Sequence, residues 1–215
     1  MKTLIVSGGE INVDFLLTML KNDSFDKIIA VDHGMEAFLT IDRHPDLIVG
    51  DFDSAKESSI AYFQKIPGIE LMQYPSRKDE TDTELAVSVA IERGSTQIIL
   101  VGAMGTRMDH TLGGIHLLGY AMERNVDCVI MDEHNRIRMT QKKVEIKKEE
   151  QYGNYVSLLP FSPVVTKITT TGMKYPLLEE DLPWFLARGV SNEIVDHVAT
   201  IKFDTGVLLV IESKD

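Results

Sequence analysis

Short apolar runs alternate with longer, mixed segments through the first 133 residues of the chain. Each run is rich in β-branched side chains and is bounded by a charged residue or a glycine. Five runs show this pattern: TLIVSG (3–8), KIIAVD (27–32), DLIVGD (46–51), QIILVGA (97–103) and DCVIMDE (127–133). Because they show little polar alternation, we expect them to be strands buried on both faces of a sheet.

The segments between these runs carry apolar residues at helical spacing and predict helices. They are VDFLLTMLKN, MEAFLTID, SSIAYFQKI, TELAVSVAIERG and GGIHLLGYAMERN. Alternation of strand and helix is typical of a parallel sheet with helices on both faces, so we expect residues 1–133 to form a Rossmann-like α/β domain. Glycine or aspartate follows nearly every strand, at the edge where such sheets bind ligands.

The pattern changes from about residue 134 onward. IRMTQKKVEIKKEE alternates apolar and charged residues with a period of two, and NYVSLLPF, VTKITTTG, VDHVATIKFD and GVLLVIES continue as strands without a helical pattern between them. This favours an antiparallel β-sandwich domain over residues 134–215. Asp204-Thr205-Gly206 separates the last two runs, and its residue types predict a hairpin turn.

Composition narrows the class of protein. With 215 residues and 44% hydrophobic content the chain can bury a core, and 33 acidic against 22 basic residues argue against nonspecific nucleic-acid binding. No stretch approaches the ~20 apolar residues of a membrane helix, and the N-terminal run is too short for a signal peptide. The single cysteine, Cys128, lies in an apolar run and is expected to be a buried thiol. We therefore expect a cytoplasmic protein.

Two aspartates end the third apolar run. Asp51 and Asp53 are spaced i, i+2, and in an extended segment such residues point to the same side of the chain. Two converging carboxylates repel each other unless a cation or a proton lies between them, and Mg²⁺ prefers oxygen ligands of this kind. The alternative is a turn that uses aspartate only for its loop geometry.

A second acidic group stands where the fourth helix is expected to begin. Asp79 and Asp82 lie in the stretch SRKDETDTEL, in which Thr81 and Glu84 fit a capping box. Asp82 in the first turn would also interact favourably with the helix dipole. Neither role requires Asp79, so we hypothesise that both acidic pairs converge on one metal site.

A third group follows the strand QIILVGA. Gly102 and Gly105 would let the backbone come close to a ligand, Arg107 offers a planar fork for phosphate oxygens, and Asp109 adds a carboxylate. The alternative for the last two is a salt bridge with each other. SGGE at residues 7–10 is a glycine turn that suits phosphate, although it lacks a full nucleotide-binding motif.

In this order, SGGE, VDHG, GDFDS, KDETD and GAMGTRMDH, followed by GMKYPL and SNE, the chain resembles the thiamine pyrophosphokinase family over essentially its full length. The resemblance implies transfer of pyrophosphate from ATP to the hydroxyl of thiamine, giving thiamine diphosphate and AMP. It implies an ATP- and metal-binding catalytic domain over residues 1–133, and a thiamine-binding and dimerisation domain over residues 134–215. The expected assembly is a homodimer.

The resemblance also implies roles for individual residues. Magnesium would be held by Asp51, Asp53, Asp79 and Asp82. The catalytic residues would be Asp51, Asp53, Asp82 and Arg107. The nucleotide would be bound by Gly8, Gly9, Asp32, Gly34, Arg107 and Asp109. Thiamine would be bound by Asp82, Ser191, Asn192 and Tyr175.

The sequence motifs by themselves are also compatible with two other functions. DFDS resembles the nucleophile loop of haloacid-dehalogenase-type phosphatases, but that loop normally follows the first strand, whereas two strands precede it here. A phosphatase would release phosphate without needing thiamine. The chain could also be a nucleotide- or metal-binding module that does not catalyse a reaction, in which case it would bind ATP without turnover.

Overall fold

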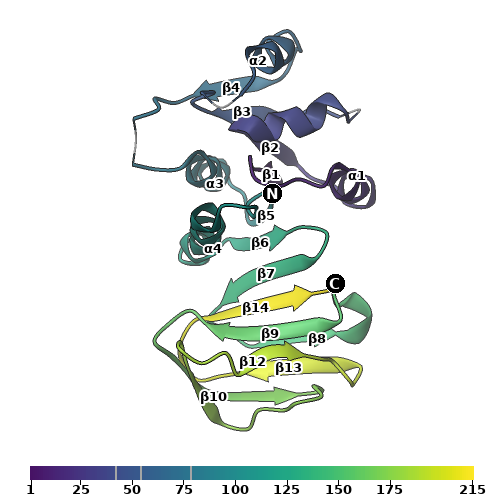
Figure 1. Ribbon diagram of the computed structural model, residues 1–215, viewed down its shortest axis with the longest axis vertical. Helices are drawn as coiled ribbons and strands as arrows, with labels where there is room; N and C mark the ends of the chain where they lie inside the picture. The colour runs from purple at the N-terminus through teal and green to yellow at the C-terminus, as the bar shows by residue number, and fades with distance from the viewer. Residues whose placement is uncertain (42, 54, 78) are drawn as a thin grey trace. The chain divides into compact units, whose positions relative to one another are not determined.

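The chain divides into two compact units, Met1–Glu133 and His134–Asp215 (Figure 1). This computed structural model describes residues 1–41, 43–53, 55–77 and 79–215. Asp42, Ser54 and Lys78, which belong to the segments MEAFLTID, GDFDS and KDETD, lie outside the described residues. Within those ranges, no helix is both long enough and apolar enough to cross a membrane.

The strands of the first unit pair in parallel in the order β6-β5-β1-β2-β3-β4. Their bounds are β1 Lys2–Val6, β2 Lys27–Val31, β3 Leu47–Gly50, β4 Glu70–Gln73, β5 Gln97–Val101 and β6 Asp127–Met131. From β1 the chain runs outward through β2 and β3 to β4, and then returns to place β5 on the other side of β1. The order of the strands therefore reverses between β1 and β5, and ligands of open α/β sheets bind at such a point.

Helices cover both faces of these strands. They are α1 Val13–Asn22, α2 Glu57–Phe63, α3 Asp82–Glu92, α4 Met108–Met122 and the 3₁₀ helix η1 Asp32–Leu39. Figure 1 shows α3 and α4 on one face and α1 on the other. The helix expected at MEAFLTID is η1, which begins directly after β2 and therefore includes Asp32. Cys128 is buried in β6 as predicted, and this burial raises the pKa of its thiol far above the ordinary range.

The second unit contains two antiparallel sets of strands, β12-β9-β14-β7 and β11-β10-β13-β8. Their bounds are β7 Asn135–Thr140, β8 Val144–Lys147, β9 Tyr155–Pro160, β10 Val164–Thr171, β11 Glu180–Pro183, β12 Gly189–Asn192, β13 Val198–Lys202 and β14 Leu208–Ser213, with a short 3₁₀ helix η2 at Lys148–Glu150. Apolar side chains of both sets, such as Ile146, Leu158, Ile201 and Val210, meet in one buried core. The predicted combination of a parallel sheet and a separate antiparallel sheet is thus confirmed.

The predicted hairpin at Asp204-Thr205-Gly206 is wrong. β13 pairs with β10 and β8, whereas β14 pairs with β7 and β9, so this turn carries the chain between two sets of strands. Backbone bonds hold the turn against β10: the Asp204 N–H donates to the Thr166 carbonyl, and the Thr166 N–H donates to the Thr205 carbonyl, both at 3.0 Å. Turn residues predict that a chain reverses, but the burial of each strand's apolar face selects its partner.

Candidate active site

Three carboxylates converge at the carboxyl ends of β2 and β3. Asp32 directly follows β2, while Asp51 and Asp53 follow β3, and one oxygen of each lies within 4.8 Å of the other two. The two strands pair in parallel with Val31 opposite Val49, so the residues that follow them meet at the same edge. The sequence pattern predicted convergence of Asp51 and Asp53. The family resemblance placed Asp32 with the nucleotide, and its convergence with Asp51 and Asp53 was not predicted.

The backbone around this cluster adopts an unusual conformation. Asp32 has φ 44° and Phe52 has φ 64°, and side chains other than glycine rarely occupy this left-handed region. Gly50 lets β3 come close to Asp32, because a Cβ at residue 50 would lie 3.1 Å from the Asp32 Cβ. The Asp53 N–H donates to Asp51 Oδ1 at 3.0 Å and closes the turn between them. The fold therefore holds the carboxylates together at the cost of local strain.

Electrostatic repulsion within the cluster acts on Asp53. The neighbouring Asp51, through its charge and a hydrogen bond, raises the pKa of Asp53 above its ordinary value, and partial desolvation and the charges of Asp32 and Asp82 add smaller increases. These charges are all negative, so a bound proton or cation relieves the repulsion. A hard divalent cation fits a donor set made of carboxylate oxygens.

Asp82 and Asp79 are not among the three carboxylates that converge. Asp82 is the first residue of α3, and its negative charge adds a small increase to the pKa of Asp53. The predicted cap is present: Thr81 Oγ1 accepts the Glu84 N–H at 3.2 Å. Asp79 is exposed, and the described carboxylates that converge do not include it. The role of both residues as metal ligands stays a prediction.

Glycines at the ends of β1 and β5 allow the loops to pack closely. The Gly9 N–H donates to the Gly102 carbonyl at 2.8 Å, and a Cβ at Gly9 would lie only 2.4 Å from that oxygen. A Cβ at Gly34 would lie 2.3 Å from the Val6 carbonyl. Gly8 differs, because a Cβ there would have ordinary space, with its shortest contact at 3.5 Å from the His33 Cβ. Gly9 and Gly34 are therefore required by packing, whereas packing does not require a glycine at residue 8, and the binding of the nucleotide by these glycines stays a prediction.

Arg107 and Asp109 form an exposed ion pair at the start of α4. The guanidinium donates through Nη2 to Asp109 Oδ2 at 2.6 Å and through Nε to Oδ1 at 3.2 Å. This pairing lowers the pKa of Asp109 to about 2. The salt bridge considered from the sequence is thus present. It orients the guanidinium but leaves three of its five N–H groups for other acceptors.

In the second unit, Asn192 is committed to the backbone of a neighbouring loop. Its Oδ1 accepts the Tyr175 N–H at 3.0 Å, and its Nδ2 donates to the Tyr175 carbonyl at 2.7 Å. Asn192 is buried, while Tyr175 and Ser191 are exposed. The Ser191 N–H donates to Ser157 Oγ at 3.0 Å, and Ser191 has φ 59°. The Asn192 side chain therefore fixes the backbone of the loop that contains Tyr175.

An exposed apolar segment lies between β11 and β12. Trp184, Phe185 and Leu186 have exposed fractions of 69%, 68% and 50%. Tyr175 and Leu178, in the loop before β11, are also largely exposed. The sequence pattern gave Trp184 no role in a site. So many large apolar side chains close together in the chain are typical of a surface that binds a partner or a ligand.

Two family models match the chain. The model described as "Thiamin pyrophosphokinase, catalytic domain" matches residues 19–130, and that described as "Thiamin pyrophosphokinase, vitamin B1 binding domain" matches residues 141–208. The chain is 34% identical to thiamine pyrophosphokinase from Bacillus subtilis (strain 168), over 100% of each chain. It is 25% identical to thiamine pyrophosphokinase 1 from Oryza sativa subsp. japonica, over 80% of this chain and 67% of that protein.

Solved structures show the same similarity in three dimensions. A crystal structure of thiamine pyrophosphokinase from Bacillus subtilis matches with a TM-score of 0.90 and 33% identity, covering 100% of each chain. One of thiamin pyrophosphokinase from Geobacillus thermodenitrificans matches with a TM-score of 0.84 and 31% identity, covering 100% of this chain and 98% of that one. The similarity extends over both units.

Proposed function

The chain belongs to the thiamine pyrophosphokinase family, and on this premise we propose that it transfers the pyrophosphoryl group of ATP to the hydroxyl of thiamine in the presence of Mg²⁺. The products are thiamine diphosphate and AMP. The family identifies the protein as a diphosphotransferase. The observation that supports the dependence on a metal and a nucleotide is the convergence of Asp32, Asp51 and Asp53 at the carboxyl ends of β2 and β3.

The donor set fits Mg²⁺. Asp32, Asp51 and Asp53 supply carboxylate oxygens, and like-charge repulsion, which raises the pKa of Asp53, means that the cluster gains from a cation. Asp79, which precedes α3, and Asp82, its first residue, would add two further carboxylates near the ion. When bound, the ion offsets the negative charge of the triphosphate and orients it.

The other residues act on the reacting groups. The thiamine hydroxyl oxygen attacks the β-phosphorus, the bond from that phosphorus to the oxygen bridging to the α-phosphate breaks, and AMP leaves with the electron pair. Asp82 orients the hydroxyl and accepts its proton. Arg107 directs its remaining N–H groups at phosphate oxygens, while Asp109 holds the guanidinium in place. The loop containing Gly8 and Gly9 accommodates the phosphates, with Gly34 packed against the end of β1.

Thiamine recognition is assigned to the second unit, because the vitamin B1 binding model matches residues 141–208. The exposed ring of Tyr175 attracts the cationic thiazolium, and Ser191 offers a hydroxyl to the aminopyrimidine. Asn192 acts through Tyr175, whose backbone it holds on both sides. The exposed segment of Trp184, Phe185 and Leu186 supports a homodimer, since association would bury it. The single buried thiol is compatible with the cytoplasm.

The test is AMP release from ATP and Mg²⁺, with and without thiamine. Thiamine-dependent AMP, lost in Asp53→Asn, supports the proposal. A matched control is Glu70→Gln, which changes a carboxylate at the opposite end of the parallel strands, where Glu70 pairs with Arg93. Phosphate release without thiamine would favour a phosphatase. ATP binding without turnover would favour a binding module, and either result would overturn the proposal.

A further inference from the structure

Glu36 connects the two loops that carry the converging carboxylates. It lies in η1, one turn after Asp32, and its side chain is only 14% exposed. Among the described residues, its partners come from the segment that follows Asp53, apart from His33 Nδ1, which lies 3.6 Å from Oε1. Lys56 Nζ donates to Oε2 at 2.8 Å, and the Lys56 N–H and Ser59 Oγ lie 3.4 Å and 3.5 Å from Oε1.

These contacts matter because the carboxylate cluster spans two loops. Asp32 is fixed by β2 and η1, whereas Asp51 and Asp53 belong to the loop between β3 and α2. Contact among the three depends on holding the second loop against the first. Glu36 does this from the β2 side by binding a backbone N–H and two side chains of residues 56–59. We propose that Glu36 is a positioning residue that sets the affinity of the Asp32–Asp51–Asp53 cluster for divalent cations.

Lys56 balances the negative charge of Glu36. The hydrogen bond from Lys56 lowers the pKa of Glu36 below its ordinary value, so the side chain is ionised, and the ammonium offsets its negative charge. Lys56 is 70% exposed, so this ion pair contributes little to global stability. Its effect should be concentrated in the geometry of the loop. This inference rests on the metal site of the proposed function.

The experiment measures Mn²⁺ binding to the whole chain by electron paramagnetic resonance, without nucleotide or thiamine. Glu36→Gln and Lys56→Met are each expected to weaken Mn²⁺ binding about tenfold, as losses of supporting contacts around metal ligands do. The control Glu70→Gln removes a carboxylate that is also ion-paired in the first unit, and should bind Mn²⁺ like the unchanged chain. Asp53→Asn should weaken binding further than either supporting variant.

Lys56→Met separates positioning from simple charge. Removing a positive charge near a cation site strengthens binding electrostatically, whereas loosening the loop weakens it. Weaker Mn²⁺ binding in Lys56→Met therefore supports positioning, and stronger binding overturns it. Normal binding in Glu36→Gln alongside impaired binding in Asp53→Asn would overturn the role of Glu36 but retain the metal site. A wild-type chain that binds no Mn²⁺ would overturn both.

Catalysis provides a second readout. A positioning defect raises the Mg²⁺ concentration needed for half-maximal AMP formation and leaves kcat near normal once Mg²⁺ is saturating, because the ion itself then holds the loops together. A loss of kcat in Glu36→Gln that saturating Mg²⁺ does not restore would contradict the inference. Thermal unfolding without divalent cations should be almost the same for Lys56→Met and the unchanged chain.

Discussion

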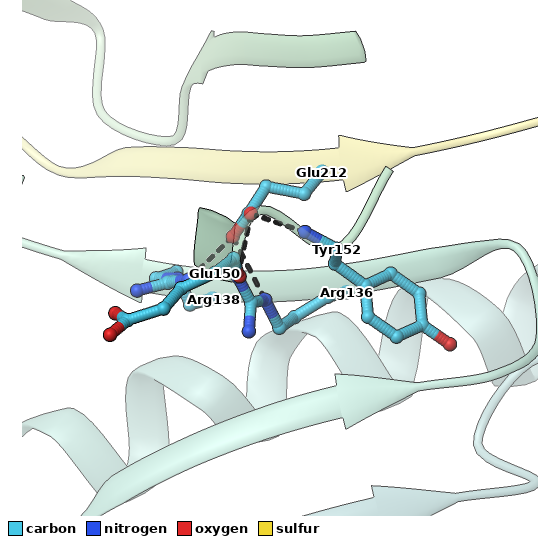
Figure 2. A network of polar contacts seen from close by, with 5 residues as sticks. All are labelled: Arg136, Arg138, Glu150, Tyr152 and Glu212. Atoms are coloured by element: carbon cyan, nitrogen blue, oxygen red, sulfur yellow. Dashed lines mark hydrogen bonds and ion pairs between the residues drawn. The ribbon is translucent and has the colours of Figure 1, made fainter. Parts of the chain in front are cut away.

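Glu212 in the second unit and Asp53 in the first are both carboxylates near the end of a strand, but the charges around them have opposite signs. Glu212 is fully buried, yet the Arg136 guanidinium donates to it twice, at 2.6 Å and 2.9 Å, Arg138 donates once, and the Tyr152 N–H adds another bond (Figure 2). Asp53 is exposed and is surrounded mainly by other carboxylates.

The two pKa values shift in opposite directions for this reason. Burial raises the pKa of Glu212, but the bonds from Arg136 and Tyr152 and the charges of both arginines lower it more, so it lies below its ordinary value. The pKa of Asp53 is raised by Asp51. For Glu212 the chain supplies the counter-charges itself, and for Asp53 it gathers like charges. The first arrangement stabilises a fold, while the second creates a need for a cation at a cost in stability.

The largest expected effect is on catalysis, in Asp53→Asn. AMP formation should fall about a thousandfold, as it does when a charge-stabilising group is removed from an active site. The melting temperature without divalent cations should rise slightly, because one repelling charge is lost. Calorimetry and the AMP assay on the same preparation check both signs. A fall in thermal stability would show that Asp53 stabilises the fold, as Glu212 does, and would remove the contrast.

Glu212→Gln should behave in the opposite way. Removing the shared anion leaves two partly exposed arginines without their partner, and the free energy of unfolding should fall by about 3 kcal/mol, at the lower end for broken buried pairs. Urea unfolding measures this change. The control Glu145→Gln alters an exposed glutamate paired with Lys143 in the same unit and should leave unfolding unchanged. Equal effects of the two variants would show that burial of Glu212 contributes nothing.

The pH dependence of stability should separate the two sites again. The folded pKa of Glu212 lies below its ordinary 4.5, so its contribution is present above that value and is lost as pH falls through the folded pKa. The pKa of Asp53 is raised above 3.8, so the folded state binds this proton more tightly, and stability declines as pH rises from 3.8 through the raised pKa.

Melting temperatures from about pH 3 to about pH 7 should therefore diverge between the variants. The deficit of Glu212→Gln should shrink toward the acid end, whereas the advantage of Asp53→Asn should grow as pH rises. Added Mg²⁺ should reverse the second trend, since a bound cation favours the ionised cluster. Curves for both variants that run parallel to the unchanged chain would mean that neither carboxylate has a shifted pKa.

The contrast between these sites also shows what the sequence could predict. Asp51 and Asp53 are two residues apart, so their convergence follows from local strand geometry, and α1 follows from the helical spacing of its apolar residues. Asp32 joins the cluster because β2 lies beside β3, and no local pattern encodes this neighbourhood. Glu212 meets Arg136 across 76 positions of sequence.

Other differences between the predictions from sequence and the structure have separate causes. The turn residues at 204–206 indicated a reversal correctly but could not identify the partner strands. β4, β11 and β12 were missed because each is only four residues long and lacks a sustained apolar pattern. The hydrogen bonds of Asn192 to both backbone groups of Tyr175 were not predicted, and its assignment to thiamine from SNE stays a prediction. Side-chain partners of this kind appear only when distant segments are placed in space.

The smallest expected effect distinguishes a third kind of carboxylate. Asp109 has its counter-charge in Arg107, like Glu212, but both partners are exposed, so Asp109→Asn should leave thermal unfolding unchanged. If Arg107 directs its remaining N–H groups at phosphate, loss of its support should raise the KM for ATP several-fold, about tenfold at most, with a smaller change in kcat. Steady-state kinetics of AMP formation measures this. An unchanged KM for ATP would mean that Arg107 and Asp109 form an ordinary surface ion pair. Exposure alone would then not give a carboxylate a role in catalysis. Like-charge neighbours, such as those around Asp53, would be needed as well.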